Sequence, residues 1–123
     1  MLSLEQAVRA ALGPGGALAQ AVHRFQARPG QLEMALAVCR SLEQGGALVV
    51  EASTGVGKTF SYLVPALIGG ERVLLSTATK TLQDQLHGRD LPRLIEALRL
   101  PVSTALLKGR SSYLCIHRMQ QAL

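Results

Sequence analysis

The sequence predicts an α/β fold in which a parallel sheet is flanked by helices, with further helices before the first strand. Two short apolar runs, residues 47–52 and 72–77, have the β-branched and leucine-rich composition of buried strands. A glycine-containing loop and an apolar helical stretch, residues 60–68, separate them. Strand, helix and strand in this order form a βαβ unit, which requires parallel strands and a right-handed crossover.

The expected helices are defined by their apolar periodicity and by residues that begin or end them. Ser3 and Asp90 stand at candidate N-cap positions, and the glycines and proline of residues 13–16 separate the first two helices. Residues 28–30 predict a turn, and the glycines at 45–46 end the third helix in the left-handed conformation. The expected helices cover residues 2–12, 17–25, 31–42, 60–68, 79–86 and 90–98. A third strand at residues 102–107, a loop at 108–113 and a last helical piece complete the chain.

Composition and charge limit the class of protein. The chain has 123 residues, of which 48% are hydrophobic and 17% charged, so it is apolar enough to form a core as one unit. Residues 1–76 hold six basic and five acidic side chains, whereas residues 77–123 hold seven and three. The excess of basic over acidic side chains in residues 77–123 indicates either that a polyanion binds near this part of the chain or only that the composition is rich in arginine.

Cysteine usage and hydropathy predict a cytoplasmic protein without a membrane segment. The two cysteines are too few for a disulfide framework, which favours a reducing compartment. Cys39 lies among apolar helical residues and is interpreted as a small core residue. The apolar runs are much shorter than the roughly 20 residues that span a bilayer.

Residues 52–59 carry the most specific signal for chemistry. They read Ala-Ser-Thr-Gly-Val-Gly-Lys-Thr and match the phosphate-loop pattern GxxxxGK[ST], except that Ala52 replaces the first glycine. Backbone N–H groups and a helix N-terminus hold phosphates in such a loop, Lys58 would neutralise the β- and γ-phosphates, and the Thr59 hydroxyl would bind Mg²⁺. The residues expected to bind ATP here are Ser53, Thr54, Gly55, Val56, Gly57, Lys58 and Thr59, with Lys58 and Thr59 in catalytic roles. A simple turn between a strand and a helix is the alternative.

The motifs resemble the superfamily 2 DNA helicases of the DinG/YoaA/XPD type, and in particular the bacterial YoaA-like branch. The resemblance runs from about residue 25 to residue 118 and includes a segment like motif Ia, residues 76–86, and a segment like the one that brings in the first iron–sulfur cysteine, residues 107–115. Ser112 stands where the family often has Asn. The resemblance implies a partial RecA-like P-loop NTPase domain over residues 28–107, after a helical segment at 1–27 and before the truncated start of an iron–sulfur insertion at 108–123.

The same resemblance implies roles for individual residues. Gln31 would read the adenine edge, since its amide offers a donor and an acceptor; a solvated glutamine at a helix start is the alternative. Thr77, Thr79 and Gln83 would contact the backbone of single-stranded DNA, although Thr79 could serve only as an N-cap. Cys115 would be the first of four thiolates that hold a 4Fe–4S cluster in a longer protein.

The leading interpretation is the ATP-binding N-terminal portion of an ATP-dependent 5′-to-3′ DNA helicase in repair or replication. Its expected cofactors are ATP and Mg²⁺, with the 4Fe–4S cluster only in the full-length protein, and its partners are single-stranded or forked DNA and a clamp-loader subunit. A DEAH-like motif and a second RecA-like domain are missing from these residues, so we expect the chain alone to be inactive. The alternatives are a truncated module that binds nucleotide or DNA without unwinding, and a P-loop ATPase or kinase unrelated to DNA.

Exposure of apolar strands is a further expectation. A phosphate-loop strand is central in a parallel sheet, and without its neighbours its apolar edge would face solvent. We therefore expect the 123-residue chain to be marginally stable or to self-associate.

Overall fold

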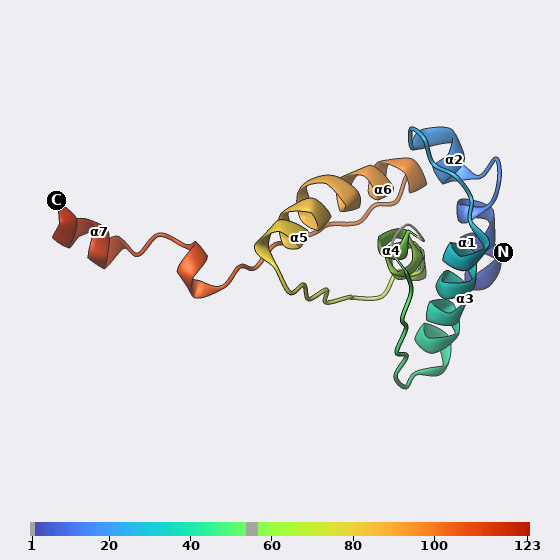
Figure 1. Ribbon diagram of the computed structural model, residues 1–123, viewed down its shortest axis with the longest axis horizontal. Coiled ribbons are helices and arrows are strands. Elements are labelled where there is room, and N and C mark those ends of the chain that lie inside the picture. Colours follow the sequence, from blue (N-terminus) through green and yellow to red (C-terminus); the bar gives the residue numbers. More distant parts are fainter. Residues whose placement is uncertain (1, 54–56) are drawn as a thin grey trace.

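The protein is a cluster of helices from which a C-terminal segment extends (Figure 1). The computed structural model describes residues 2–53 and 57–123. The regular elements in those ranges are α-helices, except that η1 is a π-helix and η2 a 3₁₀-helix. In chain order they are α1 (Leu4–Leu12), α2 (Ala17–Ala21), α3 (Pro29–Gln44), α4 (Lys58–Gly69), α5 (Lys80–Gln85), η1 (Leu86–Asp90), α6 (Leu91–Leu98), η2 (Arg110–Ser112) and α7 (Ile116–Ala122).

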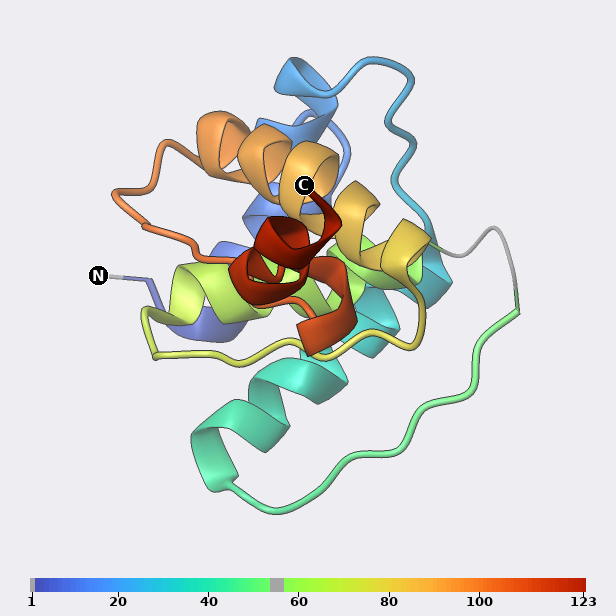
Figure 2. The same ribbon diagram turned by 90° about the vertical axis from the view of Figure 1, so that its left-hand side faces the viewer.

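The predicted parallel sheet is wrong for the residues that the structure describes, because none of them lies in a strand. Residues 47–52, 72–77 and 102–107, predicted as strands, run as extended chain without regular structure (Figure 1), and no backbone hydrogen bond joins one of these described segments to another. The first two run apart in both views, one leading from α3 to α4 and the other from α4 to α5 (Figures 1 and 2). Strands of a parallel sheet lie side by side, about 4.8 Å apart. Because these two segments run apart instead, they do not pair.

Most of the expected helices form, with shifted ends. Ser3 caps α1 as predicted: its hydroxyl accepts from the Gln6 amide at 3.2 Å, and the Gln6 side chain accepts from the Ser3 amide at 2.9 Å. The turn expected at residues 28–30 is instead the start of α3, where Pro29 occupies the first helical position. Gly45 ends α3 as predicted and has a positive φ of +78°, but its ψ of −174° lies outside the left-handed helical region that the prediction assumed.

Two other expectations about helix ends are wrong. The second helix ends at Ala21, four residues earlier than its apolar pattern indicates. Asp90 has helical dihedral angles and forms no side-chain cap, because α5, η1 and α6 run on as one nearly continuous helical stretch.

The core lies where α1, α3 and α4 meet, and α2 and α6 cover its other side. α3 packs against α4, while α1 contacts both. Phe25 and Phe60 stack at the edge of this core, with ring centroids 6.3 Å apart. The buried apolar side chains are Val8, Ala11, Leu12, Leu18, Val22, Ala35, Leu36, Cys39, Leu63, Val64, Leu86, Leu91 and Leu94.

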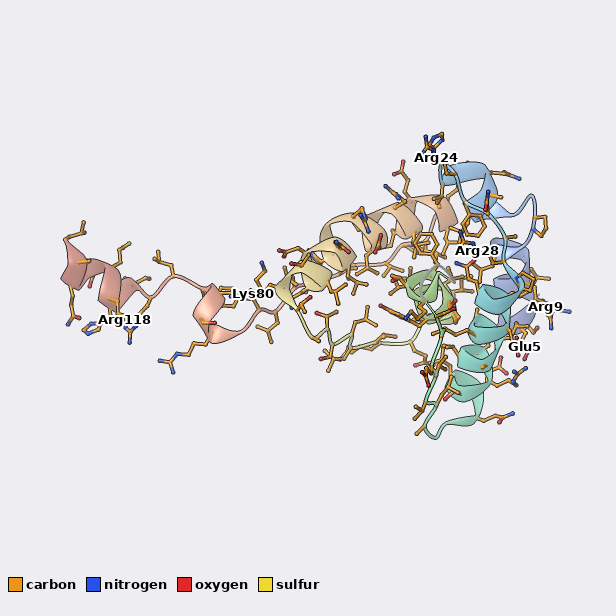
Figure 3. The ribbon with its side chains drawn as sticks, viewed as in Figure 1. Glu5, Arg9, Arg24, Arg28, Lys80 and Arg118 are labelled. Carbon is orange, nitrogen blue, oxygen red and sulfur yellow. The ribbon has the colours of Figure 1, made fainter. Side chains whose placement is uncertain are left out.

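The C-terminal segment leaves this core. Residues 113–123, which include α7, are all exposed and extend away from α1 and α3 (Figure 1). Figure 3 shows Arg118 in this segment, far from Arg9 on α1. In the described ranges no helix combines the length and the apolar character needed to cross a membrane.

Candidate functional site

The start of α4 is the part of the predicted phosphate loop that the structure describes. Gly57 precedes the helix with φ +84° and ψ +45°, a left-handed conformation that glycine adopts without strain. Lys58 then begins a helix of 12 residues, which confirms the helix predicted here and starts it two residues earlier than expected. The backbone N–H groups of this first helical turn are the anion-binding feature of a phosphate loop.

The Lys58 side chain is folded back onto the loop. Its Nζ donates to the backbone oxygen of Ala52 at 2.9 Å, so the ammonium lies across the two ends of the loop. Lys58 and Ser53 are exposed. The other predicted loop residues, Thr54, Gly55 and Val56, lie outside the described residues. A triphosphate would compete with the Ala52 carbonyl for this ammonium, and a charged acceptor is the stronger of the two.

Thr59, the predicted Mg²⁺ ligand, is half-buried next to the side chain of Tyr62. Burial raises the pKa of the Tyr62 hydroxyl, and the carboxylate of Asp90 raises it further, whereas a hydrogen bond with the Thr59 side chain lowers it. Tyr62 therefore stays protonated and neutral at physiological pH.

Gln31 lies in the first turn of α3 and is brought to the start of α4. It is 3% exposed, so the alternative of a solvated glutamine is wrong. Its Nε2 donates to the backbone oxygen of Gly57 at 3.1 Å, and its Oε1 is buried without a hydrogen-bond partner among the described residues. A Cβ on Gly57 would overlap this amide, so the close approach requires glycine.

Ser61 belongs to the same cluster, and the sequence reasoning missed it. Its side chain is fully buried, and Oγ lies 3.0 Å from the backbone oxygen of Gln31 and 3.2 Å from that of Gly57. The available signal was a small polar residue four positions after Gly57 inside an apolar helix, where a serine hydroxyl can donate to the carbonyl of the preceding turn.

The residues predicted to contact DNA gather at the start of α5. Thr79 is the N-cap of this helix and accepts from the Leu82 amide at 3.1 Å. The Thr77 hydroxyl donates to the backbone oxygen of Thr79 at 3.4 Å. Gln83 is half-buried, and its Nε2 donates to the backbone oxygen of Leu107 at 3.0 Å.

The segment after Leu107 is attached to α5 by polar contacts. Lys108 Nζ lies 3.0 Å from a carboxylate oxygen of Asp84, and the Lys108 amide donates to the Tyr113 hydroxyl at 2.8 Å. Cys115, the predicted cluster ligand, is exposed as the N-cap residue of α7. Among the residues described, no three His, Cys, Asp or Glu side chains are grouped closely enough to hold a metal ion.

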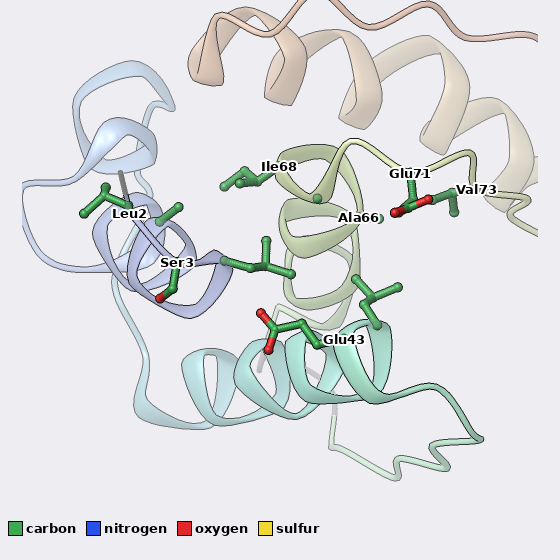
Figure 4. A pocket seen from close by; sticks show the side chains of 11 residues that line it. Leu2, Ser3, Glu43, Ala66, Ile68, Glu71 and Val73 are labelled. Atoms are coloured by element: carbon green, nitrogen blue, oxygen red, sulfur yellow. The ribbon is translucent and has the colours of Figure 1, made fainter.

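Figure 4 shows a surface pocket of about 410 Å³ at the opposite end of α4 from Lys58. It lies between α1 and the C-terminal ends of α3 and α4, and its lining includes the carboxylates of Glu43 and Glu71. These charges would repel a phosphate group, so the pocket is not a second candidate for the nucleotide.

Comparisons with known proteins place this geometry in context. The family model described as "DEAD/DEAH box helicase" matches residues 29–121. The ATP-dependent DNA helicase YoaA of Escherichia coli is 52% identical over 108 residues, which cover 88% of this chain and 17% of that protein. The ATP-dependent helicase DinG of Mycobacterium tuberculosis is 48% identical over 105 residues, 78% of this chain and 16% of that protein.

A third relative carries a different activity in its name. The 3′-5′ exonuclease DinG of Bacillus subtilis is 34% identical over 111 residues, which cover 87% of this chain and 12% of that protein. The chain thus spans 17% or less of the length of each of these three relatives. No solved structure matches.

Proposed function

Because the chain belongs to the DEAD/DEAH box helicase family, we propose that it supplies the ATP-binding N-terminal portion of an ATP-dependent 5′-to-3′ DNA helicase that acts in DNA repair or replication. In this proposal residues 28–107 belong to the first RecA-like domain, residues 1–27 precede it, and residues 108–123 begin the iron–sulfur insertion. A DNA substrate would place the protein in the cytoplasm of a bacterium. ATP and Mg²⁺ are the cofactors that this family implies.

The observation that carries the proposal is the start of α4. Gly57 adopts a left-handed conformation immediately before a 12-residue helix that begins with Lys58 and Thr59, in the order that GxxxxGK[ST] requires. Nucleotide binding would draw the Lys58 ammonium from Ala52 to the β- and γ-phosphates. The Thr59 hydroxyl would help to hold Mg²⁺, which would neutralise charge on the phosphates.

Gln31 is suited to the nucleobase in this arrangement. Its Nε2 already donates to Gly57, and its Oε1 is buried without a partner among the described residues, so the amide would accept from the amino group of adenine once the side chain turns toward the bound base. The same side chain therefore lies between the position proposed for the base and the loop proposed for the phosphates.

A DNA strand is proposed to follow the start of α5, where Thr77, Thr79 and Gln83 contribute short hydroxyls and an amide. Lys80 adds a positive charge at this end of the molecule (Figure 3). Such groups suit contacts with phosphates that do not depend on base sequence. In the longer protein Cys115 would supply the first thiolate of a 4Fe–4S cluster, and a clamp-loader subunit is a proposed partner.

Removal of the phosphate-loop lysine tests the nucleotide site. We expect Lys58→Ala to raise the Kd for Mg²⁺-ATP by more than about tenfold, because the phosphates lose their charge-assisted partner. Isothermal titration calorimetry would measure this, with Lys80→Ala as the control that leaves ATP affinity unchanged without DNA. Equal affinity in the Lys58→Ala variant would rule out the assignment.

Thr77→Val tests the DNA contact, since it removes the hydroxyl and keeps the β-branched shape. We expect a twofold to fivefold loss of affinity for a fluorescent single strand, about one neutral hydrogen bond. Thr104→Val, in an exposed segment, is the control. Anisotropy measured at several salt concentrations would show an unchanged salt slope, because no charge is removed.

A further inference from the structure

The starting point is a buried hydroxyl near the nucleotide site. Ser61 is 0% exposed, and its Oγ lies within hydrogen-bond distance of two backbone oxygens, those of Gln31 and Gly57. A hydroxyl carries one proton and donates to one acceptor at a time. The shorter distance, 3.0 Å, is to Gln31, so the hydroxyl joins the first turn of α3 to α4 next to the phosphate loop.

Gln31 is held from a second direction. Its side-chain Nε2 donates to the same Gly57 oxygen that lies 3.2 Å from the Ser61 hydroxyl. Gly57 also accepts from the Ser61 amide at 3.3 Å. The backbone and the side chain of Gln31 are thus both tied to a three-residue cluster, Gln31, Gly57 and Ser61, in which each residue contacts the other two.

We propose that Ser61 is a positioning residue of the nucleotide site, which fixes Gln31 relative to the phosphate loop and so couples recognition of the base to binding of the phosphates. The inference rests on the proposed function, in which Gln31 and the loop bind opposite ends of one nucleotide. Loss of the hydroxyl leaves the Gln31 carbonyl without this donor, and α3 can then shift along α4. Ser61 itself does not touch the nucleotide.

A comparison of two ligands tests this role in the full chain. ATP carries both the base and the phosphates, whereas inorganic tripolyphosphate carries the phosphates alone. We expect Ser61→Ala to raise the Kd for Mg²⁺-ATP about fivefold to tenfold, the effect of one buried hydrogen bond, and the Kd for tripolyphosphate less than about twofold. On a Gln31→Ala background the same substitution changes ATP affinity less than about twofold, because the coupled group is gone.

The controls separate positioning from folding. Ser41→Ala removes a half-buried hydroxyl from α3 about 15 Å along the helix from Gln31 and leaves both affinities unchanged. Ser61→Cys keeps the shape of the side chain but replaces the hydroxyl with a weaker donor. Its ATP affinity therefore lies between that of the unsubstituted chain and that of Ser61→Ala. Circular dichroism melts show which variants are folded at the temperature of the titration. If Ser61→Ala is not folded there, the same comparison of ATP with tripolyphosphate is made with Ser61→Cys.

Each result decides one point. Equal losses for ATP and tripolyphosphate would mean that Ser61 acts on the phosphate loop alone, and a lower Tm with unchanged affinities would mean that it only packs; both overturn the inference. Failure of the unsubstituted chain to bind either ligand would instead overturn the proposed function, and with it the inference.

Discussion

At the scale of single residues, Cys39 links burial to pH. It is fully buried in α3, and burial raises the pKa of its thiol from 9.0 to about 11, with a smaller contribution from Glu5 and Glu43. The unfolded chain ionises this thiol more easily than the folded one. The free energy of unfolding therefore has its full value below pH 9 as far as this thiol is concerned. As the pH rises from 9 to 11 it falls by about 2–3 kcal/mol.

Cys39→Ala tests this pH dependence. The variant is less stable at pH 7, because it loses a buried sulfur atom, but its free energy of unfolding falls less between pH 9 and pH 11 than that of the unsubstituted chain. Urea unfolding followed by circular dichroism at each pH measures the difference between the two proteins, in which the titration of Tyr62 cancels. Parallel curves for the two proteins would show that the thiol does not contribute.

At Gly57 the backbone conformation and the surroundings both require glycine. Its φ of +84° costs an alanine about 1–2 kcal/mol, and the new methyl group would overlap the Gln31 amide. We expect Gly57→Ala to lower the free energy of unfolding by at least that amount and to weaken ATP binding. Gly88→Ala is the matched control, since its Cβ would meet nothing within 4 Å and its φ is not positive; equal melting curves for the two variants would contradict this prediction.

At the scale of elements, two polar contacts join the segment around Leu107 to α5, and a third closes the segment on itself. Gln83 donates to Leu107, Lys108 pairs with Asp84, and the Tyr113 hydroxyl accepts from the Lys108 amide. The ion pair is exposed and is worth at most about 1 kcal/mol. The hydrogen bond from Gln83 to Leu107 therefore contributes as much to holding the loop on α5 as the ion pair does, and the Tyr113 bond stabilises the shape of the loop.

Tyr113→Phe removes one of these bonds and little else. The loop should open about fivefold more often, the effect of about 1 kcal/mol, and trypsin should cleave after Lys108 and Arg110 correspondingly faster. Cleavage after Arg118, in the exposed helix α7, serves as the internal control and keeps its rate. Unchanged cleavage after Lys108 would show that the tyrosine hydroxyl does not hold the loop.

The helices could be predicted from the sequence because the interactions that define them are local. Ser3 with Gln6 begins α1, and Gly45 ends α3, through contacts within one turn. The contacts of Gln31 with Gly57 and Ser61 cross 26 and 30 positions, so only the folded chain reveals them. The extended segments were predicted as strands from composition alone, whereas a strand also requires a partner that composition does not specify.

At the scale of the whole molecule, the unpaired extended segments leave apolar side chains in solvent. Val49 is 96% exposed, Leu74 is 95% exposed and Leu107 is 85% exposed, and each lies in a segment with free backbone donors and acceptors. Exposed apolar groups beside unpaired backbone promote association between chains. The helical core, in contrast, buries its apolar residues among α1, α3, α4 and α6.

We therefore expect the chain to self-associate with rising concentration and the double variant Val49→Thr, Leu74→Gln to do so less. Threonine keeps the β-branched shape at position 49, and both changes remove apolar surface without adding charge. Sedimentation velocity over a 100-fold range of concentration would measure this, with Leu123→Gln, fully exposed outside the extended segments, as the control that leaves association unchanged. A monomer over the whole range, or an equal effect of the control, would show that these side chains do not drive association.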